Sequence, residues 1–189
     1  MFKQIFELLV GLITQPAKAW SNLSGKQETN NEEFYKSYLY PLFGIVALLS
    51  FVGVFLTHKN FDVQLALKNC IGFVITAFVG FYLASYFLSK VMGKVFNRPG
   101  EIKLCQRFVG YSSSFTYVLF MVLSLFPELF FLKIFLLYTI YIIWEGAIPY
   151  MVIEENIQMK FTVLAGIIIL LTPFIIEMVM FMLMPGLRS

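Results

Sequence analysis

Polar side chains inside long apolar stretches are where chemistry is most plausible in this chain. Tyr138, Tyr141 and Glu145 recur at helical spacing, which places them near one side of a helix. Two other apolar stretches carry further hydroxyl groups close to the same membrane surface: Ser85, Tyr86, Tyr111, Ser112, Ser113 and Ser114. We predict that these nine residues line one polar cavity for a headgroup, a small ligand or a proton. The alternative is a buried hydrogen-bond network that only fixes helix packing.

Two further charges, Lys133 and Glu177, lie deep in apolar stretches, where a charge needs a partner or water. At about 1.5 Å of rise per residue, both lie about 25 Å from one membrane surface, whereas Glu145 lies about 7 Å from it. We therefore predict an intramembrane ion pair between Lys133 and Glu177. The alternative is that Lys133 extends alone to the outer headgroups.

The same depths separate Glu145 from Glu177 and disfavour a pair of catalytic carboxylates. No metalloprotease or serine-hydrolase motif is present, so we expect no catalytic residue and no enzyme activity. Cys70, Cys105 and His58 are too few and too scattered for a metal site, and we expect no metal and no cofactor.

The elements that carry these residues are five apolar stretches, each long enough to cross a bilayer as a helix. They cover residues 38–56, 70–89, 108–126, 129–150 and 161–184. The chain has 189 residues, of which 59% are hydrophobic and 13% charged. This pattern predicts an all-α polytopic membrane protein, with a transmembrane domain over residues 38–184.

The charge distribution predicts orientation. The link between the second and third stretches is the most basic part of the chain, with Lys90, Lys94, Arg98, Lys103 and Arg107. Because basic residues stay on the cytoplasmic side, we expect a multi-pass cell-membrane protein with a cytoplasmic N-terminus and an outer C-terminus. The basic link is suited to anionic lipid headgroups. The net charge of +3 is too small to indicate a nucleic-acid partner.

Residues 1–37 form a segment of their own. Apolar residues from Phe2 to Ile13 recur at helical spacing, which predicts an amphipathic helix at the membrane surface; a signal peptide ending near Ala19 and a helix packed under the bundle are the alternatives. Pro16 suits the first turn of a second short helix, on which Trp20 would lie at headgroup depth. A polar connector over residues 24–33 follows.

The second stretch carries small residues at four-residue spacing: Gly72, Thr76, Gly80 and Ala84. Small residues allow helix backbones to approach closely in lipid. We predict that this stripe packs against a neighbouring span of the same chain; a homo- or hetero-oligomer contact is the alternative.

Three segments are distinctive: LITQPAKAWSNLS near the N-terminus, SYLYPLFGI at the first stretch and GYSSSFTYVLF at the third. Together they resemble the Yip family, the Ypt/Rab-GTPase-interacting membrane proteins, in its prokaryotic form. The chain departs from the eukaryotic pattern, since the run around Pro41 lacks the acidic residue and no proline follows Gly110 and Tyr111 closely.

The resemblance implies a non-catalytic role in membrane organisation or trafficking, as a scaffold that acts through lipid and protein partners. The departures from the family pattern argue against GTPase binding. A second hypothesis is a small transporter or channel component whose route passes the polar residues around Glu145.

Overall fold

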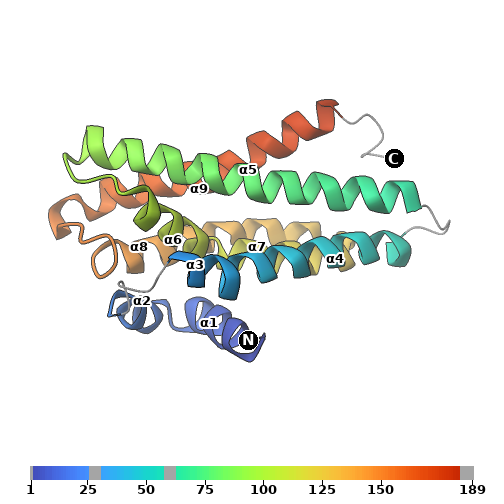
Figure 1. The fold of residues 1–189 in the computed structure, drawn as a ribbon, viewed down its shortest axis with the longest axis horizontal. Helices are drawn as coiled ribbons and strands as arrows, with labels where there is room; N and C mark the ends of the chain where they lie inside the picture. The colour runs from blue at the N-terminus through green and yellow to red at the C-terminus, as the bar shows by residue number, and fades with distance from the viewer. Residues whose placement is uncertain (1, 26–30, 58–62, 184–189) are drawn as a thin grey trace.

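The protein is almost entirely helical in the described part of the chain, residues 2–25, 31–57 and 63–183 of a computed structural model (Figure 1). In chain order the elements are α1 (Phe2–Thr14), α2 (Pro16–Ser24), α3 (Asn31–Phe34), the π-helical turn η1 (Tyr35–Leu39), α4 (Tyr40–Thr57), α5 (Val63–Val95), α6 (Ile102–Ser112), α7 (Ser114–Leu125), the 3₁₀ helix η2 (Pro127–Leu137), α8 (Tyr138–Ala147) and α9 (Glu155–Leu183). The predicted all-α class is confirmed.

Four helical segments are long and apolar enough to cross a membrane: Asn31–Thr57, Val63–Val95, Pro127–Ala147 and Glu155–Leu183. A fifth arises if α6 and α7 are counted as one span with a bend of 44°. The observed helices extend beyond most of the predicted apolar stretches, because α5 and α9 continue past their apolar centres with polar turns. Composition located the spans but not their full helical length.

The third and fourth spans are less regular than the sequence predicts. The third span breaks at Ser113, where the backbone leaves α-helical geometry between α6 and α7. The fourth begins as η2, a 3₁₀ segment that is kinked at Leu129 and has no buried side chains, before it becomes α-helical at Tyr138. Hydrophobicity alone does not distinguish these helix types.

The first two helices are packed against the bundle and do not lie free at a membrane surface. Ile5, Leu9 and Leu12 of α1 are buried in the main core, and α1 contacts α7 while α2 contacts α8 (Figure 1). Pro16 begins α2 as predicted. Trp20 is fully buried, so its ring packs against aromatic neighbours inside the bundle and does not face lipid headgroups. We refer to α1 and α2 together as the N-terminal hairpin.

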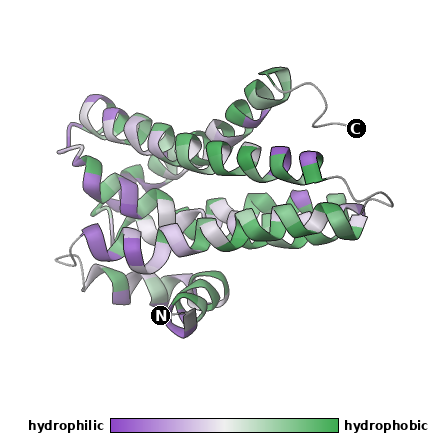
Figure 2. Cartoon of the chain, turned by 45° about the vertical axis from the view of Figure 1, so that its right-hand side comes forward, coloured by the Kyte–Doolittle hydropathy of each residue, from purple (hydrophilic) through white to green (hydrophobic). Residues whose placement is uncertain are grey.

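Apolar side chains dominate the outer surface of the helices. Phe130, Phe131 and Ile134 on η2 are exposed, as are Phe174, Ile175 and Met178 on α9. Polar residues gather at the end of the bundle where α5 leads into α6 and α8 leads into α9, which we call the junction end (Figure 2). So large an apolar surface requires lipid as its solvent.

Some predicted features lie outside the described residues. They are half of the polar connector, at residues 26–30, together with His58.

Candidate functional site

The N-terminal hairpin is fixed to the bundle through Trp20. Its indole nitrogen donates a hydrogen bond of 2.9 Å to the carbonyl oxygen of Ile142 in α8. Its ring stacks on Phe108 with centroids 5.2 Å apart and lies 5.0 Å from the Tyr150 ring. Gly146 faces the indole, and a Cβ atom there would overlap it. One side chain therefore joins α2, α6 and the α8–α9 region.

A second hydrogen bond connects the hairpin to the bundle, this time with its donor in the bundle. The hydroxyl of Tyr138 in α8 donates a hydrogen bond of 2.7 Å to the carbonyl oxygen of Ile13 in α1. Both helices of the hairpin thus make long-range hydrogen bonds to α8, which holds the hairpin at a defined position.

Between the hairpin, α3, η1 and α6 lies a cavity of about 610 Å³, which we call the hairpin cavity. This volume falls within the range of about 300–1,000 Å³ that is typical of small-molecule sites. The buried part of its lining includes Ile5, Phe34, Tyr38, Arg107, Tyr111 and Tyr150. The exposed part includes Gln4, Glu7, Gln15, Lys18, Asn22, Glu33 and Ser37.

Arg107 is the charged residue on the buried side of this cavity. Only 9% of it is exposed, so it does not belong to a lipid-facing basic loop. It acts electrostatically on the hydroxyls of Tyr111 and Tyr150. The loop prediction is wrong at this residue because α6 begins at Ile102 and turns the Arg107 side chain into the bundle.

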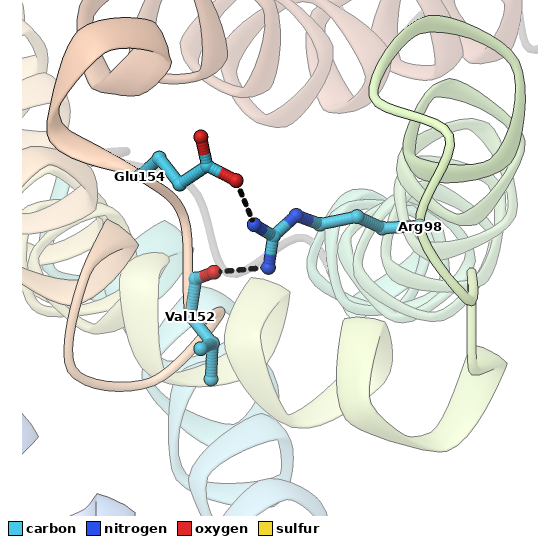
Figure 3. Close-up of polar contacts among 3 residues, drawn as sticks. All are labelled: Arg98, Val152 and Glu154. Atoms are coloured by element: carbon cyan, nitrogen blue, oxygen red, sulfur yellow. Dashed lines mark hydrogen bonds and ion pairs between the residues drawn. The ribbon is translucent and has the colours of Figure 1, made fainter.

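The rest of the basic link divides into two kinds of residue. Lys90, Lys94 and Lys103 are exposed, as a headgroup-binding surface requires. Arg98 instead joins the two links at the junction end: it pairs with Glu154 at 2.7 Å and also donates a hydrogen bond to the Val152 carbonyl oxygen (Figure 3). Arg98 therefore connects the two links within the protein more than it contacts lipid.

The nine residues predicted to line one polar cavity do not share a cavity, although Tyr138 and Tyr141 lie together on α8 with ring centroids 5.5 Å apart and Glu145 lies next to Tyr141. Tyr111 lines the hairpin cavity, Ser113 lines a second cavity described below, and Glu145 lines neither. Tyr86 and Tyr141 are exposed on the outside of their helices. Depth along the spans was insufficient for this prediction, because residues at one level point in different directions around the bundle.

The buried hydroxyls of that group instead bond within the helix bundle. Ser85 donates to the carbonyl oxygen of Phe81 at 2.8 Å, one turn earlier in α5. Ser114 donates to the Tyr111 carbonyl oxygen and shares a hydrogen bond with Tyr38. Ser112 is buried as well, but its Oγ atom has no hydrogen-bond partner among the described residues. These contacts fit the packing alternative better than a shared ligand site.

Lys133 and Glu177 do not form an ion pair in the part of the chain that the structure describes. Lys133 is exposed on η2, which packs mainly against α7 and α8, whereas Glu177 belongs to α9. Equal depth in consecutive spans did not bring the two side chains together, because η2 and the end of α9 are not close neighbours.

The stripe of small residues in α5 lies against α9 at one point and beside a cavity elsewhere. A Cβ atom at Gly80 would lie 3.3 Å from the Cα atom of Pro173, so the two backbones cross closely there. Gly72, Thr76, Gly80 and Ala84 also line a cavity of about 190 Å³ between α5, α7 and α9, the α5–α9 cavity. Glu177 lies on its wall.

The sequence did not indicate that Lys18, Glu33 and Arg107 line one cavity, nor that Trp20 anchors the hairpin beside it. Charged residues near span ends are common, and no spacing links positions 18, 33 and 107. The available indication was the i, i+3, i+4 pattern of α6, which places Arg107 on the same side as Tyr111.

The fold and the apolar surface define a multi-pass helical membrane protein. The Yip1 domain model matches residues 10–184, nearly the whole chain, so the protein belongs to the Yip1 domain family. This match includes α2, which supports the treatment of the hairpin as part of the domain. No curated protein and no solved structure matches the chain significantly.

Proposed function

We propose that this Yip1-domain protein is a non-catalytic membrane-organising or scaffold factor that acts through lipid and protein partners. The observation that carries the proposal is the docked N-terminal hairpin. Trp20 and Tyr138 fix it to the bundle, while Phe6 (68% exposed) and Val10 (39% exposed) point outward from α1.

Such a hairpin would act as a wedge. An amphipathic helix inserts its apolar side only to the boundary between headgroups and acyl chains, so it occupies area in one leaflet. A helix fixed to a bundle inserts at a constant depth and cannot leave the membrane. One-sided insertion of this kind favours membrane curvature and marks a place where partners assemble.

We also propose that the junction end faces the cytoplasm in the cell membrane. Lys90, Lys94 and Lys103 are exposed there, and Lys3, Lys18 and Lys36 belong to the exposed N-terminal region. This concentration of basic residues favours the cytoplasmic side. The C-terminus would then lie outside.

Vesicle shape tests the wedge. Full-length protein reconstituted into uniform liposomes should reduce vesicle diameter or form tubules, as measured by electron cryomicroscopy. The double variant Phe6→Ser/Val10→Ser should lose this effect, because its α1 no longer inserts.

The matched control is Leu48→Ser, which removes a similarly exposed apolar side chain from α4. It should leave the effect on vesicle shape unchanged. Unaltered vesicles with the wild-type protein, or an equal effect in the double variant, would contradict the proposal. Crosslinking in native membranes would then identify whichever protein partners assemble with it.

A transporter route through Glu145 has less support, since Glu145 lines neither cavity. Ion and solute flux in the same liposomes, compared with Glu145→Ala, provides the direct test.

A further inference from the structure

The hairpin cavity carries its charges in two layers. Its buried side holds one cation, Arg107, and its exposed side holds Lys18 together with the carboxylates Glu7 and Glu33. The described lining is therefore positive inside, negative on balance outside, and neutral in sum. A ligand that matches this pattern carries an anion and a cation a few bonds apart.

We propose that the hairpin cavity binds the headgroup of a membrane phosphoethanolamine lipid, with the phosphate at Arg107 and the amine at the outer carboxylates. This inference does not rest on the membrane-organising role, because it concerns binding and not membrane shape.

The buried side suits a phosphate. A guanidinium presents its donors in a planar fork that matches phosphate oxygens, and burial strengthens the interaction because the local dielectric constant is low. Tyr111 and Tyr150 line the same cavity as Arg107. Phenol hydroxyls can donate hydrogen bonds to phosphate oxygens that the guanidinium does not contact.

The exposed side suits a primary amine. Glu7 lies 3.8 Å from Lys3 in a weak exposed pair, whereas Glu33 has no ion pair in the described part of the chain. A primary ammonium donates three hydrogen bonds and can satisfy a carboxylate directly. A quaternary choline group donates none, so Glu33 favours ethanolamine over choline.

The setting favours a lipid over a soluble metabolite. Ile5, Leu8 and Leu23 contribute apolar side chains to the same lining, next to the outward-facing apolar residues of α1. These surfaces can continue the contact from the headgroup to the glycerol and the first carbons of the acyl chains. A soluble phosphoethanolamine would leave them uncovered.

Native mass spectrometry of the full-length detergent-solubilised protein tests the assignment. Phosphatidylethanolamine, phosphatidylcholine and phosphatidylglycerol with identical acyl chains are titrated separately, and apparent Kd values are compared. We expect the tightest binding for phosphatidylethanolamine. Equal binding of all three, or a preference for phosphatidylglycerol, would overturn the proposal.

Two substitutions test the proposed phosphate contact and the proposed amine contact separately. Arg107→Gln should weaken binding of all three lipids by about tenfold, the effect of losing one charge-assisted contact. Glu33→Gln should weaken phosphatidylethanolamine alone, by roughly threefold, since an exposed carboxylate contributes less. The matched control is Glu32→Gln, which changes the neighbouring residue, pairs with Lys36 and does not line the cavity.

Thermal unfolding distinguishes lost binding from lost folding. If Arg107→Gln unfolds, lipid binding is compared in Glu33→Gln and Arg107→Lys instead. An unchanged lipid preference in a folded Glu33→Gln variant counts against the proposal. Soluble glycerophosphoethanolamine is added as a competitor. Displacement of the lipid at equal concentration would show that the ligand is a soluble metabolite and would overturn the lipid assignment.

Discussion

The two cavities of this protein lie in regions that are built differently. Around the hairpin cavity, aromatic rings and long-range hydrogen bonds connect elements that are distant in sequence, with Trp20 at their centre. Around the α5–α9 cavity, α9 crosses α5 near Gly80 and then diverges from it toward its C-terminal end (Figure 1). The walls of the first cavity are held together by aromatic contacts and long-range hydrogen bonds, whereas the second cavity lies where two helices separate.

A proline in α9 and small residues in α5 explain how the helices around the α5–α9 cavity are arranged. Pro173 lies inside α9, where it removes a backbone hydrogen bond and favours a bend. Small residues on α5 allow α9 to cross closely, but their side chains are too small to fill the space where the two helices diverge. Small side chains on α5 permit close approach at Gly80, where α9 lies near, and they leave a cavity where α9 diverges.

The largest expected effect concerns Trp20. Trp20→Ala should destabilise the protein by about 3–5 kcal/mol, because it leaves a large cavity and removes the anchor of the hairpin. Thermal unfolding in detergent and limited proteolysis of residues 1–37 provide the measurements. Trp144→Ala is the control, since Trp144 is 39% exposed and should matter little. Similar losses in both variants would remove the special role given to Trp20.

A smaller effect is expected at Gly146. Gly146→Ala places a methyl group against the Trp20 indole and should cost about 1–3 kcal/mol through overpacking. At Gly44 of α4 a Cβ atom would meet nothing within 4 Å, so Gly44→Ala should be neutral or slightly stabilising. The stabilities of the two variants are compared by their denaturation midpoints. A neutral Gly146→Ala would mean that the hairpin is less tightly docked than we describe.

The smallest effect is expected in the second region. Thr76→Ile adds bulk beside a cavity of about 190 Å³ and should change stability by less than about 1 kcal/mol. Its unfolding transition should therefore overlap with that of the wild-type protein. A loss as large as that of Gly146→Ala would show that the α5–α9 region is as tightly packed as the hairpin region, and the comparison would fail.

Much of the architecture was predictable from the sequence. The five apolar stretches and the break before α2 at Pro16 follow from local composition, as does the small-residue stripe on α5; the structure then showed that its partner at Gly80 is α9 of the same chain. The predicted cavity around Glu145 and the predicted pair of Lys133 with Glu177 do not form. Both rested on depth along a span, which says nothing about rotation around the bundle.

The sequence by itself determined that the chain is helical and which segments are long and apolar enough to cross a membrane, because these properties depend on short-range pattern and on the solvent. Only the tertiary structure decided that Trp20 is buried, that Arg107 leaves the basic surface and that residues from α1, α2, α3 and α6 share one cavity. The physical reason is that side-chain direction depends on how each helix is rotated against its neighbours, and that rotation is fixed by contacts between residues far apart in the chain.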